Sequence, residues 1–458
     1  MSATERRGAA GPGPAAARRV AVVGGGWAGC AAAVQLAGAG CAVTLFEAAR
    51  SLGGRARAVQ VGERLLDNGQ HILLGAYKDT LKLLRRVGVE PRSAFLRLPL
   101  QMRYPPGSGL LDFAAPRLPA PLHLALALLR AGGLEREDKM ALARFSTSAR
   151  WMGWQVHQDC SVTALLDRFD QTARLQRLLW RPLCIAALNT PPERASAQVF
   201  LAVLRDSLGA RRAASDMLVP RLLLDALFPD AARAWLEAHG ALVKTGARVQ
   251  AIESAGEGWR LALDGSAEDF DAVVVATAPW QAAGLLRTLP GLQDVAGQLD
   301  AFDYEPISTA YLQYDHGTRL PLPFCALLDA PADGLWGQFA FDRGQLDPGQ
   351  DGLLAVVISS AGDAAGLAQE ALAQAVAAQL AAAFGMPALA APRWSRVITE
   401  KRATFACTPG LARPANATAL PGLVLAGDYT ACDYPATLEA AVRSGAAAAA
   451  LVARAARR

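Results

Sequence analysis

Three glycines near the N-terminus have the spacing that binds the phosphates of a dinucleotide. Gly24, Gly26 and Gly29 form a G-x-G-x-x-G series directly after the apolar residues 20–23. The first glycine of such a series permits a tight turn, the second lets a pyrophosphate approach the backbone, and the third lets a helix pack closely on a strand. Phosphate binding by backbone N–H groups is therefore the first chemistry that the sequence predicts.

An acidic residue follows at the position where a dinucleotide-binding unit contacts ribose. Residues 31–39 are rich in helix formers, residues 42–46 form a second apolar run, and Glu47 ends it. Strand, glycine turn, helix, strand and acid in this order predict a Rossmann-like unit. In such a unit the carboxylate of Glu47 accepts hydrogen bonds from the adenosine ribose hydroxyls.

Composition and charge narrow the class of protein. The chain has 458 residues, a net charge of +5 and seven scattered cysteines without a C-x-x-C pair. This charge does not indicate nucleic-acid binding, and the cysteines favour reduced thiols in the cytoplasm without disulfides or a metal site. The hydrophobic share of 52% is high for a soluble enzyme. A high-GC genome could account for much of it, and an apolar substrate tunnel or a membrane-facing surface for the rest.

Two further segments bear on localisation. Residues 1–17 are rich in Ala, Gly and Pro and lack an apolar core, so they predict a disordered tail rather than a signal peptide. No stretch reaches the roughly 18 apolar residues of a membrane-spanning helix. Residues 118–129 come nearest and predict a buried helix, with an interfacial segment through which a lipid enters as the alternative. The expected location is cytoplasmic, with peripheral contact at the inner membrane under that alternative.

The residues after Glu47 resemble those of FAD-dependent amine oxidases and phytoene desaturases. Gly53, Gly54 and Arg55 match the G-G-R continuation of these flavoproteins, and residues 271–279 match the strand and turn that recross their dinucleotide fold. The resemblance implies FAD as the cofactor, with Gly54 and Arg55 along its diphosphate. Val249 is the candidate for a backbone contact to the adenine.

The C-terminal segment completes the same resemblance. Residues 423–428 read as a strand that ends in Gly427 and Asp428, and the resemblance implies that this aspartate contacts the ribityl or phosphate region. Thr437 and Leu438 open an alanine-rich helix. The positive N-terminal end of that helix would stabilise negative charge on the reduced flavin.

One group within this superfamily matches better than the others. Residues 67–77 (DNGQHILLGAY), 180–184 with 187–190, and 400–405 (EKRATF) resemble the hydroxysqualene dehydroxylases, the squalene-associated desaturase-like proteins of bacterial hopanoid pathways. That family converts hydroxysqualene, an allylic alcohol, into squalene. The resemblance implies an apolar isoprenoid substrate and an electron donor for FAD, whose identity the sequence does not specify.

Four residues are the candidates for the catalytic site of this reaction, and three of them could donate a proton. The departing hydroxyl must be protonated or polarised, and the resulting allylic cation can take a hydride from reduced FAD. His71 could donate a proton at neutral pH, with Gln70 beside it near the flavin face. Asp433 and Tyr434 are alternative donors. These three residues could have structural roles instead. His71 could simply form a hydrogen bond, and Asp433 and Tyr434 could serve in helix capping and ring packing.

The predicted fold is α/β, with two domains that each consist of separate stretches of chain. We expect a discontinuous Rossmann-like FAD-binding domain from residues 18–95, 206–290 and 393–458. We expect an α+β substrate-binding domain with a helical insertion from residues 96–205 and 291–392. Two other functions remain open. One is a carotenoid-type desaturase, in which the hydride moves from substrate to FAD, and the other is a non-catalytic flavin-binding partner of isoprenoid enzymes.

Overall fold

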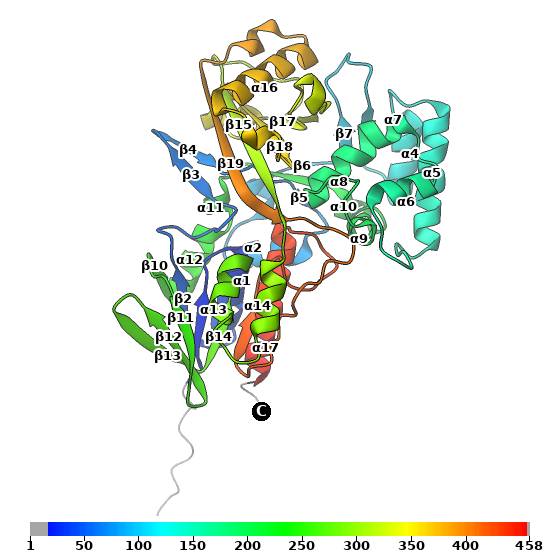
Figure 1. The fold of residues 1–458 in the computed structure, drawn as a ribbon. Helices are drawn as coiled ribbons and strands as arrows, with labels where there is room; N and C mark the ends of the chain where they lie inside the picture. Colours follow the sequence, from blue (N-terminus) through cyan, green and yellow to red (C-terminus); the bar gives the residue numbers. More distant parts are fainter. Residues whose placement is uncertain (1–16, 456–458) are drawn as a thin grey trace, which may run out of the picture.

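A computed structural model describes residues 17–455, so nearly all of the predicted tail lies outside the described residues. Two five-stranded sheets and a group of helices are the main parts of this structure (Figure 1). The first sheet has only parallel pairings and the order β10 (Leu242–Thr245), β2 (Ala42–Glu47), β1 (Arg19–Val23), β14 (Ala272–Val275) and β20 (Leu423–Leu425). The Rossmann-like unit predicted from residues 20–47 is therefore present.

Alternate side chains of β1 enter two different parts of the core. Val20 and Val22 pack with α1 (Trp27–Ala37), α12 (Pro229–Ala238) and α17 (Leu438–Ala455). The opposite face of the sheet packs against a three-stranded antiparallel sheet. That small sheet consists of β11 (Ala251–Ala255), β12 (Gly258–Leu263) and β13 (Ser266–Phe270). Burial on both faces explains why the strand is a continuous apolar run.

The second large sheet is antiparallel and lies above the first in Figure 1. Its order is β16 (Phe324–Ala326), β17 (Phe339–Asp342), β18 (Leu353–Ser359), β15 (Tyr304–Gln313) and β19 (Trp394–Phe405). One face packs against α16 (Gln369–Phe384). The other face borders the cavity described below.

The helical insertion lies beside the second sheet (Figure 1). Its main helices are α4 (Leu122–Arg130), α5 (Arg136–Trp151), α6 (Val162–Arg168), α8 (Arg181–Leu188) and α9 (Ala197–Ser207). A smaller sheet contains β5 (Leu73–Leu74), β9 (Met217–Pro220) and β6 (Phe95–Leu98). Two hairpins consist of β3 (Ala58–Val61) with β4 (Arg64–Asp67), and of β7 (Gln101–Arg103) with β8 (Asp112–Ala114). The shorter helices are α2 (Lys78–Arg86), α3 (Pro91–Ala94), α7 (Ala173–Leu175), α10 (Arg212–Ser215), α11 (Leu224–Leu227), α13 (Pro279–Leu286), α14 (Gln293–Asp300) and α15 (Arg343–Leu346).

Two predictions differ from the structure. We assigned residues 393–458 to the cofactor domain, but β19 pairs along its length with β15 and so belongs to the second sheet. The chain returns to the first sheet only after Phe405. We also predicted a buried helix within residues 118–129, whereas both Leu122 and Leu129 of α4 are exposed. Sequence alone cannot place the boundary, because strand pairing is decided by contacts far along the chain.

Candidate active site

One large cavity connects the first sheet with the second sheet and the helical insertion. Its volume is about 1710 Å³, well above the roughly 300–1,000 Å³ of an ordinary small-molecule pocket. Its lining begins at the carboxyl ends of the parallel strands β1, β2, β14 and β20, where open α/β sheets bind their ligands. It continues along an apolar face of the second sheet. The cavity therefore has room for a dinucleotide and a second, apolar ligand.

The three glycines after β1 have different structural roles. Gly24 has a φ of +109°, and a Cβ on Gly29 would lie 1.8 Å from the carbonyl oxygen of Gly24. Packing of the chain itself therefore requires both of these glycines. Gly26, in contrast, has an ordinary φ of −72°, and a Cβ there would come no closer than 3.9 Å to Gly54 Cα. Gly26 borders the cavity, so its missing side chain leaves room for a ligand.

The first turn of α1 offers free N–H donors to that space. Gly26 precedes the helix, and neither a side-chain cap nor an acidic residue occupies the first turn. Such an uncapped N-terminus attracts phosphate. Nearby, the Oγ1 atom of Thr277 is buried without a hydrogen-bond partner among the described residues and also lines the cavity. An unpartnered buried hydroxyl is costly unless a ligand or water satisfies it.

Glu47 is held in place by the backbone on both sides. Its Oε2 accepts a hydrogen bond of 2.7 Å from the N–H of Gly25, and its Oε1 accepts one of 2.7 Å from the N–H of Ala49. Each carboxylate oxygen keeps a second lone pair. Because Glu47 lines the cavity, those lone pairs are available to ribose hydroxyls.

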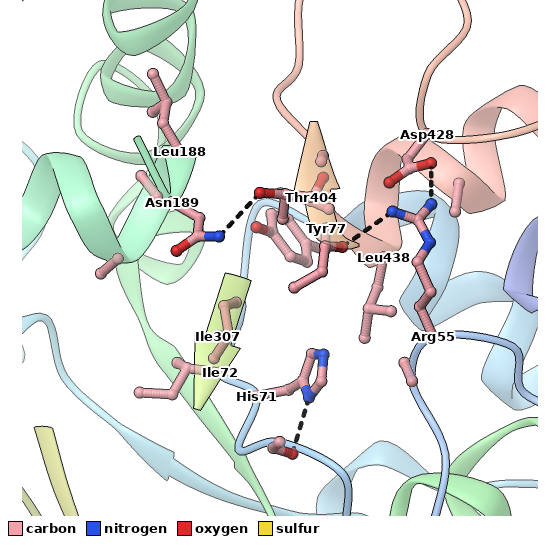
Figure 2. A pocket seen from close by; sticks show the side chains of 18 of the residues that line it. Arg55, His71, Ile72, Tyr77, Leu188, Asn189, Ile307, Thr404, Asp428 and Leu438 are labelled. Atoms are coloured by element: carbon pink, nitrogen blue, oxygen red, sulfur yellow. Dashed lines mark hydrogen bonds and ion pairs between the residues drawn. The ribbon is translucent and has the colours of Figure 1, made fainter. Parts of the chain in front are cut away.

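Arg55 and Asp428 form an ion pair in the lining of the cavity (Figure 2). The Arg55 guanidinium lies 2.5 Å from Asp428 Oδ1 and donates a second hydrogen bond of 2.9 Å to the carbonyl oxygen of Ala403 in β19. The side chain of Asp428 is only 10% exposed. The pair therefore joins the end of β20 in the first sheet to a strand of the second.

Replacement of Arg55 by leucine is expected to destabilise the protein by about 3 kcal/mol, because it leaves the buried carboxylate of Asp428 without its cation. Urea denaturation of the FAD-free protein measures this. Arg260→Leu is the matched control, since it breaks the Arg260–Asp269 pair, whose side chains are 52% and 54% exposed. We expect little loss for the control. Equal losses for both variants would contradict the assignment of a buried pair.

Gln70 is fixed at both ends of its side chain. Its Nε2 donates to the Tyr311 hydroxyl at 2.8 Å, and its Oε1 accepts from Arg343 Nη1 at 3.0 Å. Tyr311 in turn donates to the carbonyl oxygen of Asp67 at 2.7 Å. Although Gln70 borders the cavity, its polar atoms are used within the protein. The geometry favours a role in holding residues 68–72.

His71 follows Gln70 and lines the cavity (Figure 2). Its Nδ1 lies 3.2 Å from the carbonyl oxygen of Gly69. A carbonyl only accepts hydrogen bonds, so we assign the proton of the neutral ring to Nδ1. The other ring nitrogen, Nε2, points away from this carbonyl. Burial lowers the pKa of His71 below 6.5, and the bond to Gly69 opposes this shift.

Phenylalanines of the second sheet form an apolar wall of the cavity and were not among the predicted residues. Phe324 lies opposite Phe341, and Phe339 lies opposite Val357, in antiparallel register. Cross-strand partners share a face of the sheet, and all four line the cavity. The alternation of Phe339 and Phe341 was the signal available in the sequence. The insertion contributes further apolar residues, namely Leu142, Trp180, Leu183 and Phe200.

The structure brings most of the other predicted residues to the same cavity. Gly54, Val249, Gly427, Thr437 and Leu438 all line it. Figure 2 also shows a neighbouring pair that we did not predict, in which Asn189 Nδ2 donates to Thr404 Oγ1 at 2.9 Å.

Asp433 and Tyr434 are not among the residues that line the cavity. The buried hydroxyl of Tyr434 donates to Asp206 at 2.8 Å. The Asp433 side chain is 73% exposed and lies 3.5 Å from Arg205. Neither position suits a proton donor, so His71 is the candidate that we retain.

The comparisons with known proteins agree with this arrangement. Residues 27–453 match the family described as flavin containing amine oxidoreductase. The chain belongs to this family. It is 32% identical to the hydroxysqualene dehydroxylase of Rhodopseudomonas palustris, over 95% of this chain and 98% of the relative. It is 26% identical to the zeta-carotene desaturase of Synechocystis sp., over 93% and 95%. The predicted resemblance to hydroxysqualene dehydroxylases is thus confirmed.

Solved structures confirm the fold class. A putative protoporphyrinogen oxidase from Exiguobacterium sp. is 18% identical with a TM-score of 0.69, over 96% of this chain and 99% of that chain. Cyclohexylamine oxidase from Brevibacterium oxydans is 19% identical with a TM-score of 0.69, over 96% and 100%. At these identities the likeness concerns the fold.

This family member is an FAD-dependent oxidoreductase, and the cavity suits that cofactor. Gly26, the uncapped start of α1 and Thr277, whose hydroxyl has no partner among the described residues, all line the cavity where a diphosphate is expected. Within residues 17–455, every helix is too short or too polar to cross a lipid bilayer.

Proposed function

We propose that this protein catalyses the reductive dehydroxylation of hydroxysqualene to squalene. The observation that carries the proposal is an apolar cavity in which His71 is the only histidine among the described lining residues. Relatives named hydroxysqualene dehydroxylase, which align with nearly the whole chain, support the choice of substrate.

The apolar wall would bind the hydrocarbon chains of the substrate. Hydroxysqualene carries a single hydroxyl group, so its affinity must come mainly from burial of apolar surface, at roughly 25 cal/mol per Å². Phe324, Phe339 and Phe341 supply this surface from the second sheet. Their ring faces would also favour a developing cation, and their bulk would exclude water that could capture it.

The residues at the first sheet would hold the cofactor. The start of α1 beside Gly26 would bind the diphosphate, Glu47 the ribose, and the backbone at Val249 the adenine. Gly54, Arg55 and Asp428 would line the path between the diphosphate and the ribityl chain. The N-terminus of α17, at Thr437 and Leu438, would stabilise negative charge on the reduced flavin.

His71 would act as the proton donor to the departing hydroxyl. In its protonated form, the Nε2–H donates a proton to the hydroxyl oxygen, the C–O bond breaks, and its electron pair leaves with water. The hydride for the new C–H bond would come from reduced FAD, when it is bound. The products are squalene, water, a neutral histidine and oxidised FAD, so protons and electrons balance. Each turnover consumes two electrons from the reduced flavin, and an external electron donor must reduce the flavin again.

An anaerobic single-turnover experiment tests the proposal. The purified holoenzyme is reduced, hydroxysqualene in detergent is added, and flavin absorbance is followed while the products are analysed. We expect reoxidation of the flavin to match squalene formation one to one. A desaturase, the activity named for more distant relatives, would give a different pair of results. Hydroxysqualene would leave the reduced flavin unchanged, and phytoene added to the oxidised enzyme would reduce the flavin. No change with either substrate would favour a non-catalytic flavoprotein.

A further inference from the structure

Helix α4 exposes leucines near both of its ends and buries its histidine. The exposed fraction is 59% for Leu122 and 72% for Leu129, whereas His123 is 1% exposed. Of the other leucines of this helix, Leu126 is partly exposed, whereas Leu124 and Leu128 pack against the core and line the cavity. A helix whose outer face contacts water shows the reverse arrangement. The outer face of α4 is therefore suited to apolar surroundings.

Other exposed apolar residues lie close to α4. Leu118, Met140 and Trp151 are 36%, 52% and 87% exposed. The Lys139 ammonium donates a hydrogen bond of 2.9 Å to the carbonyl oxygen of Leu129, which places the start of α5 beside the end of α4. We call Leu118, Leu122, Leu129, Met140 and Trp151 the apolar patch. A clustered patch of this kind marks an interaction site, unlike single exposed residues.

Arginines flank the apolar patch. Arg117, Arg130, Arg144 and Arg150 are exposed, and none of them has a carboxylate within 4.0 Å among residues 17–455. Positive charges beside an apolar face match a lipid surface with anionic headgroups and apolar chains. An apolar protein partner would not require these unpaired arginines.

The cavity opens within this same face. Pro121 and Ala125 of the α4 region, and Ala143, Ser146 and Thr147 of α5, are exposed residues that also line the cavity. The lining reaches the surface again at the cofactor end, at Ala48, Ala49 and Arg248. Figure 1 shows α4 and α5 far from β2 and β10, which lie at that second end. The two openings are therefore separate.

We propose that the α4–α5 face docks on a bilayer containing anionic phospholipid, with the opening between the two helices turned toward the lipid. The apolar patch would enter the headgroup region, and the arginines would contact phosphates. Docking does not depend on the reaction. The passage of an isoprenoid from the bilayer into the cavity rests on the proposed function.

Vesicle cosedimentation of the holoenzyme tests the docking. We expect binding to vesicles of phosphatidylglycerol and phosphatidylcholine, weaker binding to phosphatidylcholine alone, and loss of binding as salt rises. Leu122→Ser with Leu129→Ser should weaken vesicle binding roughly tenfold or more. Leu242→Ser is the matched control, because Leu242 is 57% exposed but lies on the edge strand β10. It should bind as the unmodified protein does.

A second variant keeps the test independent of the leucines. Replacement of Arg117, Arg130 and Arg144 by glutamine should remove the preference for anionic vesicles and leave the fold intact. None of these arginines lines the cavity. Equal binding of this variant to both kinds of vesicle supports the assignment, whereas an unchanged preference would overturn it.

Other outcomes distinguish docking from the reaction. Unmodified protein that stays in the supernatant with anionic vesicles overturns the docking. Light scattering could also overturn it. If the unmodified protein is a dimer and the Leu122→Ser/Leu129→Ser variant is a monomer, the apolar patch joins two copies of the chain instead of binding lipid. Turnover of hydroxysqualene in detergent should be unaffected in the leucine variant. Failure of the unmodified protein in detergent would contradict the proposed function and leave the docking result standing.

Discussion

Replacement of His71 by glutamine is expected to lower turnover of hydroxysqualene by about 10²–10⁴-fold, the usual contribution of a general acid. Glutamine can still donate a hydrogen bond to the carbonyl oxygen of Gly69, which His71 Nδ1 contacts at 3.2 Å, but it carries no transferable proton. FAD content should therefore be unchanged. Steady-state kinetics and the flavin spectrum measure the two quantities. His157→Gln, at an exposed position, is the control and should be fully active.

The pH dependence of turnover gives a second readout on the same residue. Burial lowers the pKa of His71 below 6.5, so the neutral ring dominates at pH 7. Acid catalysis needs the protonated ring, and turnover should therefore rise as pH falls through this lowered pKa and decline above it. Burial raises the pKa of Asp67 to about 6, so that carboxyl titrates nearby. A profile that keeps its slope in His71→Gln would assign the dependence to Asp67 and remove His71 as the acid.

The sequence predicted the cofactor half of the site because that half is local. β1, the glycine turn, α1, β2 and Glu47 follow one another within 30 residues, so the contacts among them lie within one short segment of the chain. Gly24 is required by its φ of +109°, and Gly29 by its contact with the Gly24 carbonyl oxygen. Such constraints leave a pattern in a single sequence. The fold class could be predicted as well, because the strand before Asp428 joins the same parallel sheet.

The substrate half depends on contacts that no short segment contains. Phe324 and Phe341 face the cavity only because β16 pairs with β17 in one register, and a shift of one residue would turn each side chain to the opposite face. Tyr434 illustrates the same limit. It precedes α17 closely in sequence, yet its hydroxyl is held by Asp206, a residue 228 positions away. Spacing along the chain could not reveal that partner.

Replacement of Gly26 by valine is expected to weaken FAD binding by roughly 100-fold or more and to leave the apoprotein folded. A Cβ at this position has no protein atom within 3.9 Å other than Gly54 Cα, and the backbone φ of −72° is open to any residue. Gly26 borders the cavity, so the new methyl groups would take up space that a bound ligand needs. The diphosphate would then move away from the N–H donors of α1, and each charge-assisted hydrogen bond lost costs about 1.5–3 kcal/mol.

Two further glycine variants separate ligand exclusion from folding. Gly297→Val introduces the same side chain in α14 at a position with no neighbour within 4 Å, and it should retain FAD. Gly29→Ala places a Cβ 1.8 Å from the carbonyl oxygen of Gly24, so it should lose folded protein as well as cofactor. Flavin absorbance and urea denaturation of each apoprotein distinguish these cases. Full flavin content in Gly26→Val would place the diphosphate elsewhere, because a ligand at the α1 N-terminus cannot share that space with valine.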